Sequence, residues 1–141
     1  LNANLNLNRL GAFPEEYVRD LYGDGSSSIL HSTIGTDRYV VTWHLLEEDR
    51  LAHRAKFEDA GVLADLPVVN DAEAIRDYHA VRVEIPVHIQ HVKKQSADLA
   101  RAWRQSTRKA LELYLGAGFG VVGYYQDPES KRCYYILARP R

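Results

Sequence analysis

The chain has 141 residues, of which 45% are hydrophobic and 26% are charged, and its formal net charge is −1. This average composition argues against a disordered chain, and no apolar run approaches the roughly 18 residues that cross a bilayer. A charge near zero also argues against bulk nucleic-acid binding, which depends on many phosphate contacts. We therefore expect a globular, cytoplasmic protein that binds neither nucleic acid nor membranes.

The first part of the chain gives one clear strand among weaker signals. Residues 1–11 alternate asparagine and leucine, as in a strand, yet asparagine is poor in strands and Gly11 resembles a helix stop, so both interpretations stay open. A short strand is predicted over 16–22 and a loop over 23–28. The clearest strand is predicted over 37–45, which is rich in β-branched and aromatic residues.

Short helices are predicted in the middle of the chain. The pattern of residues 52–60 favours a helix that ends at Gly61. Asn70 and Glu73 have the spacing of a capping box, which predicts a short helix through Tyr78.

The second half of the chain has more regular patterns. Residues 81–85 alternate apolar and charged side chains, which predicts a half-buried strand that Pro86 ends. The longest helix is predicted over 97–115, with Ser96 as its N-cap. Its apolar stripe holds Leu99, Trp103, Ala110, Leu111 and Tyr114, and the helix is expected to stop at Gly116 and Gly118.

An antiparallel hairpin is predicted to follow this helix, with strands over 119–125 and 133–137. The succession of a helix ending in glycine, a strand, a polar loop and a strand then occurs in both halves of the chain. Residues 7–12 and 114–119 correspond in this comparison.

Residues 113–119 read Leu-Tyr-Leu-Gly-Ala-Gly-Phe, and Val-Val-Gly-Tyr-Tyr follows at 121–125. These segments resemble the end of a GNAT (GCN5-related) N-acetyltransferase, where a helix with Asn-x-x-Ala…Leu-Tyr-x-x-x-Gly-Phe precedes two antiparallel strands. The whole chain is also similar to the C-terminal half of a group of predicted GNAT-superfamily acetyltransferases. The matching residues are Leu10-Gly11, Tyr22-Gly23, Thr36-Asp37-Arg38 with Trp43, Glu84-Ile85-Pro86, Trp103-Arg104 and Thr107-Arg108.

The resemblance implies transfer of an acetyl group from acetyl-CoA to the amine of a small molecule. In such enzymes backbone N–H groups polarise the thioester carbonyl, a helix N-terminus holds the pyrophosphate, and a tyrosine protonates the departing thiolate. Counting back four residues from Gly118 reaches Tyr114, whereas the same count from Gly11 reaches Leu7, which carries no proton to give. Tyr114 is therefore the catalytic candidate, and a buried core aromatic is the alternative.

The family's pyrophosphate loop, Gln/Arg-x-x-Gly-x-Gly/Ala, does not occur in this sequence. The chain also contains no methionine and begins with Leu1. We therefore expect it to be the C-terminal part of a longer product whose main coenzyme-binding loop lies upstream. It should associate with that upstream segment or form a homodimer, because its sheet would otherwise keep an open edge.

Basic residues are concentrated between 93 and 109, where six lysines and arginines accompany a single acid, Asp98. Arg101, Arg104 and Arg108 share a helix face and could hold a phosphate or carboxylate through paired hydrogen bonds. The alternative is a solvated face that pairs with acids such as those at 47–49. Arg104 and Arg108 are the cofactor-binding candidates because they fall in the motif of the similar group.

Other chemistry-bearing residues give weaker signals. Asp37 and Arg38 precede the strand with Trp43, and a buried ion pair that holds the loop before them is favoured over a substrate contact. The six histidines lack a zinc spacing, so no metal site is predicted. Cys133 is the only cysteine, and we expect it to be a small buried hydrophobe.

The sequence thus predicts an α+β fold with a GNAT-like, mixed and largely antiparallel sheet and packed helices. Its expected parts are the end of a first unit at 1–46, a connecting segment with short helices at 47–80, and a second half-unit at 81–141. The function that the resemblance implies is that of the C-terminal part of a GNAT-family acyltransferase. The alternatives are a non-catalytic module that binds a small anion or partner through the arginine face, and a dimerisation domain.

Overall fold

The computed structural model describes residues 3–23, 35–43 and 60–139. Its fold is α+β, and all pairs of its named strands are antiparallel. The strands are β1 (Ala12–Val18), β2 (Arg38–Trp43), β3 (Ala80–Ile85), β4 (Gly120–Gln126) and β5 (Cys133–Ala138). The helices are η1 (Asn4–Arg9), of π type, α2 (Ala60–Asp65), α3 (Ile89–Gln95) and α4 (Ala97–Gly116).

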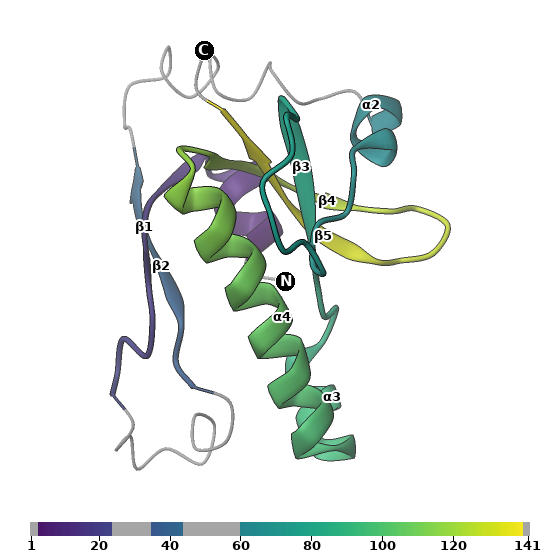
Figure 1. Ribbon diagram of the computed structural model, residues 1–141. Helices are drawn as coiled ribbons and strands as arrows, with labels where there is room; N and C mark the ends of the chain where they lie inside the picture. The colour runs from purple at the N-terminus through teal and green to yellow at the C-terminus, as the bar shows by residue number, and fades with distance from the viewer. Residues whose placement is uncertain (1–2, 24–34, 44–59, 140–141) are drawn as a thin grey trace.

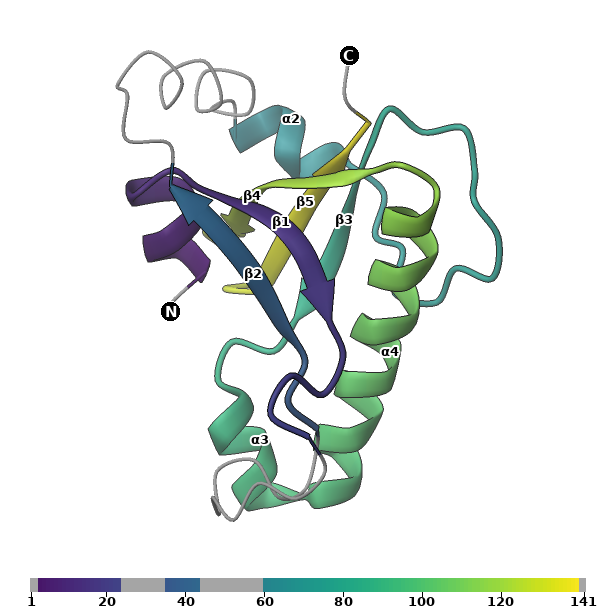
Figure 2. The ribbon, with the colours of Figure 1, turned by 90° about the vertical axis from the view of Figure 1, so that its left-hand side faces the viewer.

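The strands form two separate sheets (Figure 1). β1 pairs with β2, and β5 lies between β3 and β4 in a three-stranded sheet. A view from the side shows the β1–β2 hairpin in front of this sheet, with α4 running beside both (Figure 2). The prediction of a single mixed sheet is therefore wrong for the strands that the structure describes, while the antiparallel pairing is confirmed.

An asparagine side chain gives the physical reason for the separation. The Asn8 amide donates from Nδ2 to the Tyr124 carbonyl at 2.7 Å, and its Oδ1 accepts from the Tyr124 N–H at 3.1 Å. This amide occupies, on the outer edge of β4, the backbone groups that a further strand would use. Asn70 does the same on β3, where its amide bonds the Glu84 carbonyl at 2.9 Å and the Glu84 N–H at 2.6 Å.

The termini of α4 confirm the predictions made from the sequence. The Ser96 hydroxyl accepts a hydrogen bond from the Leu99 N–H at 3.2 Å, as an N-cap does. After Gly116, Gly118 adopts a φ of 84°, and its N–H bonds the Leu115 carbonyl at 3.0 Å. Glycine is favoured there because other residues meet steric resistance at positive φ.

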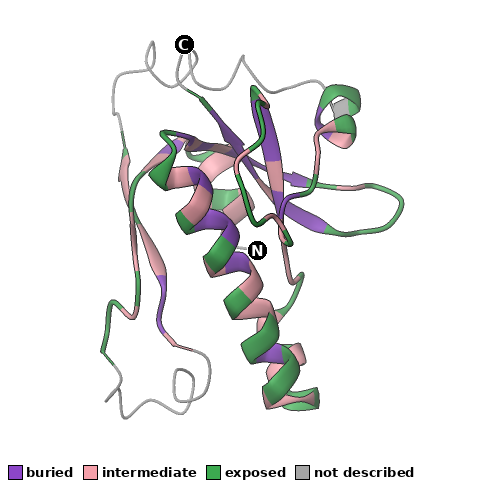
Figure 3. Ribbon diagram, in the orientation of Figure 1, coloured by how far each residue is buried: buried purple, intermediate pink, exposed green. Residues whose placement is uncertain are grey.

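The core lies between α4 and the three-stranded sheet, whose strands β3 and β5 carry long buried stretches (Figure 3). The α4 face that meets this sheet holds Ala110, Leu111 and Tyr114, each at most 1% exposed. A smaller cluster on the other face of the sheet joins Tyr134 and Ile136 to Leu63 and Tyr125. The predicted apolar stripe is corrected at Leu99, which is 47% exposed.

Several predicted boundaries agree with the structure. β2, β3 and the β4–β5 hairpin occur within one or two residues of the predicted strands, apart from the end of the 37–45 prediction, which lies outside the described residues. η1 resolves the ambiguity at the N-terminus as a helix, and Gly11 follows it with a φ of 63°. Each half of the chain therefore contains a helix followed by two antiparallel strands.

Three local predictions are wrong. The first strand covers Ala12–Val18 instead of 16–22, and the residues after it form a turn. No helix follows Asn70, because its amide is bonded to the backbone of Glu84 and does not cap the residues that directly follow it. Gly61 lies inside α2 and does not end a helix. The predicted loop at 24–28 and most of the helix at 52–60 lie outside the described residues.

Candidate functional site

A buried carboxylate fastens the β1–β2 hairpin to α4. The Asp37 side chain has no solvent exposure and accepts hydrogen bonds from Tyr17 Oη at 2.6 Å, Arg108 Nε at 2.7 Å and the Asp20 N–H at 3.1 Å. Arg108 Nη2 donates to its second oxygen. Tyr17 lies on β1, Asp37 immediately precedes β2 and Arg108 lies on α4, so one carboxylate joins three elements.

The two described ends of the β1–β2 connection contact each other beside Arg108. Asp20 accepts from the Thr36 N–H at 3.1 Å, and its Oδ2 lies 3.3 Å from Arg108 Nη2. Gly35 has a φ of 77°, and a Cβ atom there would lie 2.5 Å from Asp20 Oδ1. Glycine is therefore required for the Asp20 carboxylate to approach so closely.

The pKa values of this cluster reflect the hydrogen bonds between Asp37 and Arg108. Burial by itself would raise the pKa of Asp37, but hydrogen bonds from Arg108 and Tyr17 outweigh it and lower the pKa from 3.8 to about 2. The hydrogen bond to Asp37 raises the pKa of Arg108. Burial and the hydrogen bond to Asp37 raise the pKa of Tyr17. The pair is thus ionised at neutral pH.

Asp37 forms a buried ion pair, but the partner of its carboxylate is Arg108 and not Arg38 as predicted. Arg38 donates to the main-chain oxygen of Asp37 at 2.8 Å, whereas the Asp37 carboxylate pairs with Arg108. Arg104 Nη1 lies 4.0 Å from Asp37 Oδ2, and Arg101 is bonded to Asp98. The acids at 47–49 that were expected to pair with this face lie outside the described residues.

The cofactor-binding role of Arg104 and Arg108 stays a prediction. Most of the hydrogen bonds that Arg108 makes go to Asp37 and Asp20. An anion would have to join or displace these carboxylates. Arg104 is more available to a ligand, since its buried Nε atom has no hydrogen-bond partner in the described part of the chain.

Three tyrosines pack between the hairpin and the three-stranded sheet. The rings of Tyr17 and Tyr39 lie 5.2 Å apart, and the rings of Tyr39 and Tyr135 meet edge to face at 5.4 Å. Burial raises the pKa of Tyr39 well above its usual range. Its hydroxyl is shielded from solvent and has no hydrogen-bond partner among the described residues, which is costly for a buried polar group.

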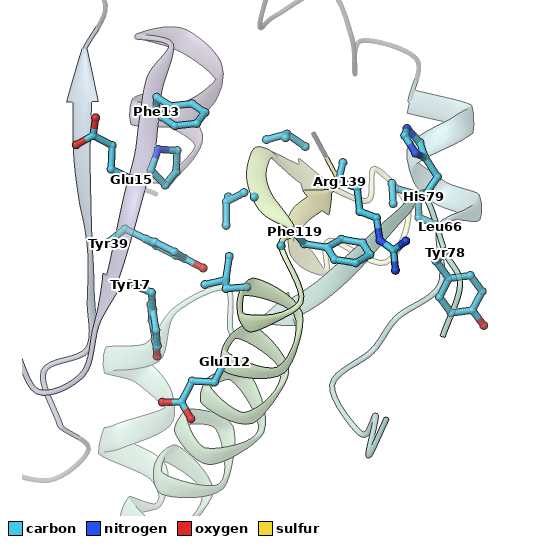
Figure 4. Close-up of a pocket in the computed structure, with 18 of the residues that line it drawn as sticks. Phe13, Glu15, Tyr17, Tyr39, Leu66, Tyr78, His79, Glu112, Phe119 and Arg139 are labelled. Atoms are coloured by element: carbon cyan, nitrogen blue, oxygen red, sulfur yellow. The ribbon is translucent and has the colours of Figure 1, made fainter. Parts of the chain in front are cut away.

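A cavity of about 1240 Å³ lies between the β1–β2 hairpin and the three-stranded sheet (Figure 4). Phe13, Tyr17 and Tyr39 line it from the hairpin, while Leu115 and Phe119 line it from the end of α4 and the start of β4. The first helix–hairpin segment (η1, β1 and β2) and the second (α4, β4 and β5) therefore both contribute residues to the cavity wall. A concave and largely apolar site of this size suits a small-molecule ligand.

Charged residues stand at the periphery of this cavity. His79 and Arg139 line the part near β3 and β5, and the Arg139 guanidinium lies 5.1 Å above the Phe119 ring. Glu112 lines the part near Tyr17 and pairs with Arg19 at 3.1 Å. The cavity thus has acidic and basic groups on different walls around an apolar interior.

Tyr114 lies in the core and is not among the residues that line the cavity. It has no solvent exposure, and its ring packs edge to face against Phe119 at 5.1 Å. Burial raises the pKa of its hydroxyl. These contacts are those of the core aromatic that was the alternative, and the proton-donor role remains a prediction.

Metal ligation receives no support from the described residues. Within 3–23, 35–43 and 60–139, no group of three or more His, Cys, Asp or Glu side chains could hold an ion. His88 and His91 lie at the start of α3. Cys133 is buried, as expected, and accepts a hydrogen bond from Tyr124 Oη at 2.9 Å. Among the described residues, no helix is long and apolar enough to cross a membrane.

Sequence reasoning missed Tyr17, Asp20, Tyr39 and Arg139 as site residues. Tyr17, Asp20 and Tyr39 fall in predicted strands, where no chemical role was assigned to them, and Arg139 lies near the end of the sequence. Nothing local marks them, because each meets partners far away in the sequence, such as Tyr17 with Asp37 or Arg139 with Phe119.

Comparison of the chain with known proteins identified no matching family model, no matching curated protein and no matching solved structure. The class defined by the fold and site is therefore an α+β protein with antiparallel sheets and an apolar cavity between them.

Proposed function

We propose that this chain is the C-terminal part of a GNAT-type acyltransferase, which moves an acyl group from a thioester such as acetyl-CoA to an amine. The cavity between the hairpin and the C-terminal sheet is proposed to receive the apolar part of a substrate. The observation that carries this proposal is that both helix–hairpin segments build the walls of one cavity.

The order of elements in the second half supports the proposal. α4 ends at Gly116, and β4 and β5 follow as an antiparallel hairpin, which is the succession that the resemblance implies. The first half repeats it with η1, β1 and β2.

The arginine face has few free donors for a coenzyme diphosphate, because Arg104 is its one residue with a buried nitrogen that lacks a partner among the described residues. A diphosphate binds where cations or backbone N–H groups are free to meet it. Arg108 is held by Asp37 and Asp20, Arg101 by Asp98, and the Ser96 hydroxyl caps the N-terminus of α4. We therefore derive no step through the coenzyme, and we propose that its diphosphate is held by sequence upstream of Leu1.

Calorimetry with acetyl-CoA tests this proposal on the present chain and on one extended upstream. Binding by the extended chain alone is the expected result. Failure of both chains to bind acetyl-CoA and a longer acyl-CoA contradicts the proposal.

The role of Tyr114 is tested in the extended chain by the substitution Tyr114→Phe. A proton donor predicts a slower acyl-transfer step with unchanged acetyl-CoA affinity, whereas Tyr22→Phe, at a residue 59% exposed, should change neither. Equal rates in both variants assign Tyr114 to the core alone.

The second candidate function is that of an anion-binding module, and Arg104 favours it. Its Nε atom is buried without a partner in the described residues, and its nearest carboxylate contact, to Asp37, is 4.0 Å long. If Arg104→Gln abolished binding of a phosphate or carboxylate while neither chain bound acyl-CoA, this candidate would replace the first.

A further inference from the structure

We propose that the cavity binds a carboxylate with a bulky apolar body, whose carboxylate is held by Arg139 and whose hydrocarbon lies over Phe119 and Leu115 toward Phe13. This inference goes beyond the proposed function, which names a thioester and an amine but no free carboxylate. Binding of a free carboxylate is measured without thioester or amine, so its failure can be told apart from failure of acyl transfer.

Arg139 is well placed to hold a carboxylate. Its guanidinium lies over the Phe119 ring at 5.1 Å, and its backbone N–H bonds the His79 carbonyl at 3.2 Å. Its side chain is 43% exposed, and its ion pair with Asp77 is 3.6 Å long. Because the Asp77 side chain is 99% exposed, this pair is weak and a ligand carboxylate can compete with it. The planar fork of arginine matches a carboxylate with two parallel hydrogen bonds.

The interior of the cavity calls for an apolar body. Phe13, Leu115, Phe119 and Val121 line it, and its volume of about 1240 Å³ far exceeds what an acetyl group fills. Gly120 also lines it, and a Cβ atom at that position would meet no heavy atom within 4 Å. The backbone at Gly120 therefore borders open space that a hydrocarbon can occupy.

The acidic residues of the cavity offer the strongest competing interpretation. Glu15 and Glu16 are exposed on β1, and Glu112 is engaged with Arg19 at 3.1 Å. These carboxylates would favour an alkylamine over an alkyl carboxylate. Figure 4 shows Glu15 on β1, across the cavity from Arg139, with its carboxylate directed away from Arg139, so it does not approach the place proposed for the ligand carboxylate.

Calorimetry with hexanoate, octanoate and decanoate tests the apolar part of the proposal. Each added methylene should raise the affinity roughly fourfold, because burial of one methylene contributes about 0.8 kcal/mol to the binding free energy. Gly120→Leu should weaken decanoate more than hexanoate while the melting temperature holds or rises, since glycine is unfavourable within a strand. Equal affinities for the three acids would overturn the proposal.

The carboxylate part is tested by Arg139→Gln against the matched control Arg132→Gln. Arg132 is 59% exposed, pairs with Glu84 and does not line the cavity. Arg139→Gln should weaken octanoate roughly tenfold, and Arg132→Gln should leave it unchanged. Equal losses in both variants, or tighter binding of octylamine than of octanoate, would assign a different ligand class to the cavity.

Discussion

The β1–β2 hairpin and the three-stranded sheet both pack beside α4, but they are attached to it by different forces. The sheet meets α4 through Leu111, Tyr114 and other side chains that are almost fully buried. The hairpin meets the same helix through the ion pairs of Asp37 and Asp20 with Arg108, and through the pair of Arg19 with Glu112. The cavity lies between these two attachments.

The two attachments should respond differently to substitution. Apolar burial is non-directional and contributes roughly in proportion to area, whereas a buried ion pair depends on both partners being present. Truncation of a core side chain is expected to weaken the packing of the sheet in proportion to the area lost. Loss of the Asp37 charge is expected to leave Arg108 without its main partner and to weaken the attachment of the hairpin.

The largest expected effect comes from breaking the apolar attachment. Leu111→Ala should lower the free energy of unfolding by about 3 kcal/mol, because Leu111 is 1% exposed and its truncation leaves a cavity. Chemical denaturation measures this loss. Leu99→Ala, the same change on the same helix at a residue 47% exposed, should cost less than about 0.5 kcal/mol. Similar losses in both variants would contradict the packing of α4 described above.

Breaking the ionic attachment should have a somewhat smaller and more local effect. Asp37→Asn is expected to cost about 2 kcal/mol, since Arg108 loses its buried partner but remains 20% exposed. Hydrogen exchange should speed up in β1 and β2 and stay slow in α4. Asp98→Asn, at a carboxylate 90% exposed, serves as the control. Uniform loss of protection would show that the hairpin is not a separate unit.

The stability that the ionic attachment contributes should depend on pH in acid. The folded pKa of Asp37 is about 2, below its ordinary value of 3.8, so this carboxylate stabilises the fold above pH 3.8 and loses that effect as pH falls toward 2. The stability difference between the wild type and Asp37→Asn should therefore be constant near neutral pH and shrink in acid. A difference that persists at pH 2 would assign the effect to packing.

The smallest expected effect has the opposite sign. Tyr39→Phe should raise the free energy of unfolding by about 1 kcal/mol, because it removes a buried hydroxyl that has no partner among the described residues. Tyr17→Phe should lower it by a similar amount, because the Tyr17 hydroxyl donates to Asp37 at 2.6 Å. Thermal denaturation of the two variants compares them directly, and a loss in both would mean that the Tyr39 hydroxyl is satisfied.

The elements with strong local patterns could be predicted from the sequence. α4 follows from its Ser96 cap and its glycine stop, and the β4–β5 hairpin follows from its β-branched and aromatic strands. Asn70 shows where local rules fail. Its spacing to Glu73 favoured a helix cap, but its amide instead bonds Glu84, fourteen residues away. A local pattern cannot show that a distant strand offers better partners.

The candidate site was less predictable than the fold. Arg108 was singled out for its position in a basic helix face, but its partners Asp37 and Asp20 lie 71 and 88 residues away in sequence. Arg139 gave no signal at all. It faces Phe119 because β5 brings the end of the chain beside the start of β4.

Local sequence patterns predict an α+β chain with one long capped helix and a C-terminal hairpin, because periodicity and capping act over a few neighbouring residues. Contacts in three dimensions place the described strands in two sheets, join Asp37 to α4 and leave a cavity between the hairpin and the three-stranded sheet. These features depend on contacts between distant segments, and such contacts leave no trace in the spacing of neighbouring residues.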